Sequence, residues 1–213
     1  MIGDKLVITD YHGQGAAKVM DALRSRLAAA PGATLAVSVA GESGSGKSEI
    51  AHCLAELAER DGGRTFIFGQ DDYFKLPPRS NHNKRLDDIS WVGPDEVRLD
   101  LLDEHIAFLK KNAGIPLTKP LVYFEENEIR EEVIEPGRLD VIITEGTYTS
   151  LLENVDLRAF IDRDYRQTKK ARLNRNRDPD VQFLEQVLEI EHQEISRHKA
   201  RADVIIEAPP EER

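Results

Sequence analysis

Residues 36–50, AVSVAGESGSGKSEI, join an apolar, β-branched run to a helical pattern through a turn rich in glycine and serine. Gly41 is followed after four residues by Gly46, Lys47 and Ser48. Glycines let the backbone adopt conformations that a Cβ would obstruct, so successive amide hydrogens can converge on phosphate oxygens. A strand before such a turn and a helix after it are the context of the Walker A motif. The residues therefore predict a site for the phosphates of a nucleotide.

The residues of this turn have separate predicted roles. Lys47 reaches the β and γ phosphates as a point charge, the Ser48 hydroxyl ligates Mg²⁺, and the helix beginning near Lys47 adds its positive end. An ordinary glycine- and serine-rich turn ahead of a helix is the alternative. The residues expected to bind the cofactor, ATP with Mg²⁺, are Gly41, Glu42, Ser43, Gly44, Ser45, Gly46, Lys47, Ser48 and Glu49.

Two acidic residues directly follow other apolar runs. Asp71 comes after the run at 65–68, and Glu145 lies just past the end of the apolar run in RLDVIITEG. In a parallel sheet ligands lie beyond the carboxyl ends of the strands, so both acids are expected beside the phosphate turn. Phosphoryl transfer to an alcohol needs a carboxylate that orients the hydroxyl and takes its proton. We expect Asp71 to be this base, with Asp72 as the alternative, and Asp71 or Glu145 to contact Mg²⁺. Acids that merely cap strand ends are the plainer interpretation.

A long charged helix is predicted from about 167 to about 200. It contains Arg172, Arg175 and Arg177. If residues 166–180 close over the site as a lid, these guanidinium groups would bind the triphosphate and the transferring phosphoryl group, with Arg172 as a catalytic residue and Arg175 as a nucleotide ligand. A surface helix of solvated charge is the alternative.

Strands alternating with helices predict a three-layer α/β/α fold of the P-loop NTPase type with a mainly parallel sheet, in one domain spanning 1–213. Residues 1–32 are expected to form a short strand, at 5–8, and a helix. Residues 115–137 are expected to form two short strands around a polar turn, a hairpin flap. The segment 75–96 has the proline, asparagine and charge content of a long loop.

The composition narrows the class of protein. A chain of 213 residues with 40% hydrophobic and 32% charged residues is typical of a soluble globular protein, and no signal peptide or bilayer-spanning run is visible. A net charge of −10 argues against a general nucleic-acid binder, because a phosphate backbone would be repelled. The single cysteine, Cys53, cannot form an internal disulfide, which favours a reducing, cytoplasmic setting. Assembly as a homo-oligomer is left open.

The ordered motifs resemble those of the uridine kinase and phosphoribulokinase family of P-loop kinases over most of 34–206. GESGSGKS corresponds to the phosphate loop, QDDYF to the family's Asp-containing motif, and IITEG to its Glu-Gly strand end. VGPDEV resembles its His-Pro-Asp loop and VYFEENEIR its Tyr-to-Arg flap motif. The resemblance implies ATP-dependent phosphorylation of a small hydroxyl-bearing metabolite, a nucleoside or sugar-type acceptor. It also implies that Asp71 is the base and that Tyr123 and Arg130 line the acceptor pocket. Tyr73 is also expected to bind the acceptor.

Four positions depart from the family pattern. Phe124 and Glu128 stand where the flap of uridine kinases usually has Asp and His, and Val92 and Gly93 stand where the loop has Asp and His. Groups that hydrogen-bond a hydroxyl discriminate strongly between substrates, so their loss argues against uridine itself. A nucleotide-dependent switch, or a family member that binds without catalysing, remains the alternative to a kinase.

Overall fold

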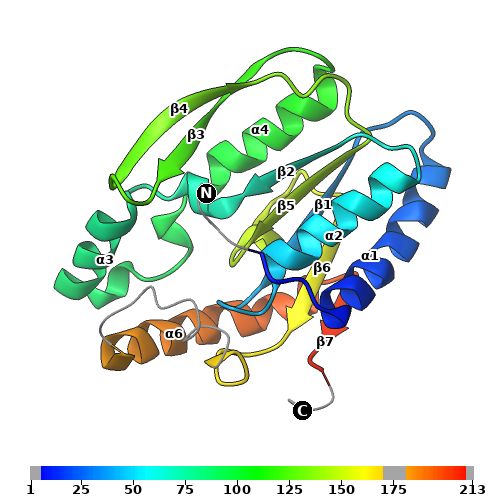
Figure 1. The fold of residues 1–213 in the computed structure, drawn as a ribbon. Helices are drawn as coiled ribbons and strands as arrows, with labels where there is room; N and C mark the ends of the chain where they lie inside the picture. Colours follow the sequence, from blue (N-terminus) through cyan, green and yellow to red (C-terminus); the bar gives the residue numbers. More distant parts are fainter. Residues whose placement is uncertain (1–5, 170–180, 210–213) are drawn as a thin grey trace.

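The computed structural model describes residues 6–169 and 181–209, and its centre is a five-stranded sheet (Figure 1). The strand order is β2-β5-β1-β6-β7, and every neighbouring pair is parallel. This arrangement confirms the mainly parallel sheet expected from the continuous apolar runs. The strands are β1 (Leu35–Gly41), β2 (Thr65–Gly69), β5 (Val141–Gly146), β6 (Leu157–Asp162) and β7 (Val204–Glu207).

Helices cover both faces of the sheet and make the three layers (Figure 1). Alternate residues of β1 separate the two cores, because successive side chains of a strand point to opposite faces. Val37 and Val39 pack in a cluster with α1 and α2, whereas Ala36 and Ala40 pack in a second cluster with α4 and the end of α6. The helices are α1 (Asp10–Ala29), α2 (Lys47–Arg60), α3 (Pro78–Asp87), α4 (Leu99–Lys111) and α6 (Val181–Ile195). Short 3-10 helices span Gln70–Tyr73, Ile89–Trp91, Pro94–Glu96, Thr149–Leu151 and Ser196–Arg201.

The leading segment forms the expected helix but not the expected strand. Residues 6–8 belong to no strand, and α1 begins at Asp10. His12 ends the extended chain at this point, because its Nδ1 accepts a hydrogen bond of 3.0 Å from the Thr9 amide and so caps the helix start. The apolar residues of α1 at helical spacing are buried against α2, as their pattern predicts.

The segment 75–96 contains a helix, α3, so the expectation of a continuous loop is wrong. Pro78 occupies the first turn of α3, where a missing amide hydrogen costs nothing. The helix has no apolar stripe and is instead held by a buried acid, Glu96, whose side chain is 0% exposed. Arg85 donates to both Glu96 oxygens at 2.6 and 2.9 Å, and the Asn81 amide nitrogen donates at 2.5 Å. Hydrogen bonds from Asn81 and Arg85 to Glu96, rather than an apolar face of the helix, therefore stabilise α3.

The hairpin expected at 115–137 is present as β3 (Leu117–Tyr123) and β4 (Glu128–Ile134), an antiparallel pair separate from the main sheet. Asp72 anchors it to the end of β2. The Asp72 carboxylate accepts from the Val122 amide at 3.1 Å and lies 3.4 Å from Lys119 Nζ. Both charged side chains are buried, so this contact fixes the hairpin against the sheet edge.

The long charged helix expected from 167 to 200 is shorter where the structure describes it. Helix α6 ends at Ile195, and a 3-10 helix, Ser196–Arg201, continues the chain to β7. No helix in the described ranges is long and apolar enough to cross a membrane.

Replacing Asp72 with alanine removes the acceptor of the Val122 amide and one acidic partner of the buried Lys119. We expect Asp72→Ala to lower the free energy of unfolding by about 2 to 3 kcal/mol, measured by urea denaturation. Asp21→Ala is the control, because the Asp21 side chain is 76% exposed and its ion pair is on the surface. Equal stability of the two variants would contradict the anchoring role of Asp72.

Candidate active site

The turn after β1 has the backbone of a phosphate-binding loop. It leaves the sheet at Gly41, between β5 and β6, and ends where α2 begins at Lys47. Gly44 and Gly46 have φ values of 76° and 101°, in the left-handed region that favours glycine. A Cβ on Gly46 would lie 2.7 Å from the His12 Nε2 atom, and one on Gly41 would lie 2.9 Å from the Ser45 hydroxyl oxygen. Side chains at these two positions would therefore distort the loop.

The polar groups of the loop fit a phosphate. Ser45 is fully buried, and its hydroxyl has no hydrogen-bond partner among the described residues. The amides of the first turn of α2 have no partner within the helix and carry its positive end. Lys47 Nζ donates to the Glu42 carbonyl oxygen at 2.9 Å, which keeps the ammonium group at the loop. A phosphate bound here would satisfy these donors together.

Two carboxylates and a hydroxyl meet beside the loop. Glu145 is the last residue but one of β5, in register with Val39 of β1, and the Ser48 side chain lies close enough to its carboxylate to lower its pKa. Burial, helped by the negative charge of Asp71, raises the pKa of Glu145 to about 7, although Lys47 and Ser48 act in the opposite direction. The structure thus brings together Lys47, Ser48, Asp71 and Glu145, which the sequence analysis had assigned to one site.

This oxygen-rich group fits Mg²⁺. Mg²⁺ prefers oxygen ligands and usually keeps several waters, binding through one or two carboxylates together with phosphate oxygens of the substrate. Ser48, Asp71 and Glu145 offer such a set next to the phosphate loop. Within the described ranges, no group of three or more His, Cys, Asp or Glu side chains forms a separate cage for a metal. A metal at this site would therefore depend on phosphate oxygens for part of its coordination.

The two neighbouring acids after β2 differ in their surroundings. Asp71 is exposed, whereas Asp72 is buried and holds the hairpin. The 3-10 turn Gln70–Tyr73 points the two side chains in different directions. Asp72, the alternative base of the sequence analysis, is therefore occupied by a structural role, and Asp71 is the acid that a small molecule can reach.

Tyr73, another residue expected at the acceptor, is buried in this structure. Tyr73 is 0% exposed and lies in the core beside α4, with its hydroxyl 2.8 Å from the His105 Nδ1 atom. Burial raises the pKa of the Tyr73 hydroxyl. Its aromatic ring packs edge-on against Phe68, so the side chain contributes to folding.

Tyr123 and Arg130, the other two residues expected at an acceptor, lie together on the hairpin. The Arg130 guanidinium carbon is 4.2 Å from the centre of the Tyr123 ring, within the range of a cation–π contact. Arg130 also forms an ion pair with Glu128, with a nitrogen–oxygen distance of 2.7 Å. Arg172, Arg175 and Arg177 of the expected lid lie outside the described residues.

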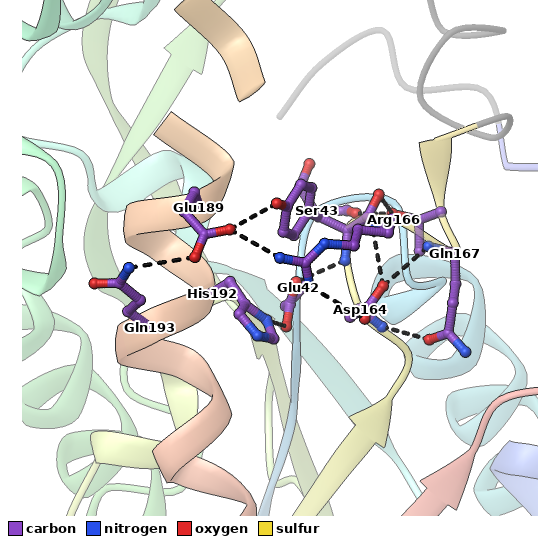
Figure 2. A network of polar contacts seen from close by, with 10 residues as sticks. Glu42, Ser43, Asp164, Arg166, Gln167, Glu189, His192 and Gln193 are labelled. Atoms are coloured by element: carbon purple, nitrogen blue, oxygen red, sulfur yellow. Dashed lines mark hydrogen bonds and ion pairs between the residues drawn. The ribbon is translucent and has the colours of Figure 1, made fainter. Parts of the chain in front are cut away.

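Glu42 forms a contact that the sequence analysis missed. Its carboxylate lies 2.6 Å from His192 Nδ1 on α6 and accepts a hydrogen bond of 2.7 Å from the Tyr165 amide (Figure 2). A cavity of about 380 Å³ opens beside this pair, between α6 and the ends of β6 and β7. Glu42 and His192 are 150 residues apart, and no motif links them. The sequence offered one hint of this contact, namely the acidic residue Glu42 at the first position that the Walker A motif leaves variable.

Residues 36–212 match the sequence model of the Phosphoribulokinase / Uridine kinase family. The chain belongs to this family. The matched range includes the phosphate loop, Asp71 and Glu145, as well as the hairpin. The resemblance seen in the ordered motifs is thereby confirmed.

Three similar proteins place this family member in context. It is 26% identical over 184 residues to the bifunctional alpha-galactosidase/sucrose kinase AgaSK of Mediterraneibacter gnavus, covering 80% of this chain and 20% of that protein. It is 30% identical over 152 residues to a uridine kinase of Clostridium novyi (strain NT), covering 71% of this chain and 66% of that protein. The chain thus spans a fifth of the first relative and about two thirds of the second. The structure of phosphoribulokinase from Rhodobacter spheroides shares the fold with a TM-score of 0.62 at 12% identity, over 81% of this chain and 69% of that one.

The raised pKa of Glu145 predicts a pH-dependent stability of the protein without ligands. The folded state binds a proton on Glu145 more tightly than the unfolded chain does, so stability falls as pH rises from the ordinary value of 4.5 to about 7. Glu145→Gln lacks this titration. We therefore expect the variant to gain about 2 kcal/mol of unfolding free energy relative to the natural chain between pH 5 and pH 8, measured by urea denaturation.

Glu126→Gln serves as the matched control, since Glu126 is exposed in the hairpin turn. A stability difference between Glu145→Gln and the natural chain that is constant across this pH range would show that the Glu145 carboxylate is not buried as described.

Proposed function

We propose that this chain transfers the γ-phosphoryl group of ATP, with Mg²⁺, to a hydroxyl of a small metabolite of the nucleoside or sugar type. The observation that carries the proposal is the meeting of Ser48, Asp71 and Glu145 beside the loop that holds Lys47. These groups come from three different strand ends. Phosphoryl transfer requires such an arrangement, because its catalysis depends mainly on positioning and charge neutralisation.

Each residue has a role that follows from its surroundings. The loop amides and Lys47 bind the β and γ phosphates and neutralise charge that develops on the γ-phosphoryl group. Ser48 and Glu145, whose side chains lie near one another, would hold Mg²⁺. Mg²⁺, when bound, supplies further neutralisation of the phosphate oxygens. Asp71 is exposed, so it can accept the proton of the attacking hydroxyl.

The charges on the acceptor side favour an uncharged acceptor. Arg130 of the hairpin is neutralised by Glu128, and Arg85 of α3 is held by Glu96 and Glu191. Acidic side chains dominate the hairpin and its turn, and their field would repel an anionic acceptor such as a sugar phosphate. These acids are Glu125, Glu126, Glu128, Glu131 and Glu132. The names of the relatives, a uridine kinase and a sucrose kinase, agree with acceptors of this class.

Removal of the Walker lysine tests the donor half of the proposal. We expect Lys47→Ala to lower ATP consumption by about 100-fold or more, because the phosphates lose their nearest cation. ADP release from Mg-ATP measures this loss. Lys111→Ala is the control, since Lys111 is exposed at the far end of α4. Undiminished ATP consumption by Lys47→Ala would overturn the assignment of the loop.

Removal of the proposed base tests the acceptor half. ADP release would be measured with a panel of nucleosides, mono- and disaccharides, pantothenate, glycerate and sugar phosphates. We expect one uncharged acceptor to accelerate ADP release and to be phosphorylated in equal amount. Asp71→Asn should lower this rate by about 10²- to 10⁴-fold and weaken Mg-ATP binding far less, because the amide cannot take a proton but keeps an oxygen that can ligate Mg²⁺.

Asp87→Asn, an exposed acid at the end of α3, should retain the full rate. A panel in which no compound accelerates ADP release, together with tight ATP binding, would replace the kinase with a nucleotide-dependent switch or a non-catalytic family member.

A further inference from the structure

Glu42 uses its backbone and its side chain for different partners. Its carbonyl oxygen accepts from Lys47 Nζ, and its carboxylate, in a residue only 5% exposed, pairs with His192 of α6 at 2.6 Å. Phosphate-loop residues commonly act through their amides, so a buried carboxylate directed away to another helix is a separate feature. Through Glu42, the loop residue that accepts from Lys47 is also connected to α6.

A second set of contacts reinforces the same connection (Figure 2). The segment after β6 donates the Tyr165 amide to Glu42 at 2.7 Å and the Thr168 hydroxyl to the Ser43 carbonyl at 2.8 Å. The Tyr165 hydroxyl then donates to Glu189, one turn before His192 on α6, at 2.7 Å. The first two variable residues of the loop are therefore held from both sides, by the segment after β6 and by α6.

The residue before His192 contacts the opposite side of the site. The Glu191 carboxylate accepts from Arg85 of α3 at 3.2 Å, and Arg85 in turn donates to the buried Glu96. Consecutive residues of a helix point about 100° apart, so Glu191 and His192 can contact different neighbours. Two consecutive residues of α6 thus connect the phosphate loop to the segment 78–96, which follows Asp71 in the chain.

Buried ion pairs of this kind contribute little net stability, because desolvation offsets their attraction, but they are costly to break by removing one partner. They therefore fix the relative position of the segments that they join. Phosphoryl transfer is sensitive to displacements of about 1 Å between donor and acceptor. We propose that α6, through Glu191 and His192, sets the position of the phosphate loop relative to the segment 78–96, and that Glu42 and His192 are positioning residues of the reaction proposed above.

The donor side of the proposal is tested by calorimetric binding of Mg-ATP, which needs no acceptor. We expect Glu42→Ala and His192→Ala each to weaken binding by about tenfold and the double variant to weaken it no more than Glu42→Ala alone, because both variants remove the pair that Glu42 forms with His192. Glu42→Gln should restore most of the affinity, since its amide oxygen can still accept from the Tyr165 amide. His52→Ala is the matched control, because His52 faces Glu56 at 3.5 Å in an exposed pair on α2.

A merely structural pair gives a different result. Glu42→Ala and His192→Ala would then lower the melting temperature while the folded protein bound Mg-ATP as tightly as the natural chain, and the proposal would be overturned. Independent, additive losses of affinity would overturn it as well. If the natural chain itself fails to bind Mg-ATP, the proposed kinase function fails, whereas normal ATP binding by all variants removes the positioning role alone.

The connection to the acceptor side is tested by hydrogen–deuterium exchange of 78–96. We expect Mg-ATP to slow exchange in this segment of the natural chain and to have no such effect in Glu191→Gln, even though this variant still binds Mg-ATP. The exposed variant Glu126→Gln should behave as the natural chain. If Mg-ATP does not slow exchange of 78–96 in the natural chain, α6 does not join the two sides. The same conclusion follows if Mg-ATP still slows this exchange in Glu191→Gln.

Discussion

The parallel register of β1 against β5 and β6 is the constraint on which the site depends. It pairs Val39 with Glu145 and ends β1 at Gly41, beside Ile161 of β6. A shift by one residue would turn the apolar side chains of β1 to the wrong core, so the two buried faces hold the register. With β1 in the centre of the sheet, the loop at its carboxyl end has an acid-bearing strand next to it. The phosphate loop and Glu145 are neighbours for this reason.

Three buried acidic residues fix other segments, which lack a hydrophobic core of their own, to the rest of the fold. Asp72 holds the hairpin, Glu96 holds α3, and Glu42 holds the phosphate loop to α6. Each accepts hydrogen bonds from charged or backbone donors, as a buried carboxylate must. Such contacts specify a geometry more than they add stability. The elements around the proposed acceptor are thus positioned by polar contacts, while the sheet is positioned by apolar packing.

The distribution of charge separates the two halves of the site. Positive groups gather where phosphates would bind, at Lys47 and the start of α2, whereas the hairpin is acidic. The uncharged acceptor proposed above would not be repelled by the field of the acidic hairpin on its way to Asp71. The net charge of −10 is therefore compatible with the proposed phosphate-binding role of the loop, because such a loop relies on local amides and one lysine.

Local patterns in the amino-acid sequence were enough to predict the parallel sheet, the phosphate loop and the placement of Asp71 and Glu145 at strand ends. These features depend on local patterns, namely apolar runs, glycine spacing and the residues that directly follow a strand. Three further features emerge only from long-range packing: the place of Tyr73 in the core, the helix α3, and the pairing of Glu42 with His192. These depend on partners far along the chain, and a contact between side chains 150 residues apart leaves no periodic signal in one sequence.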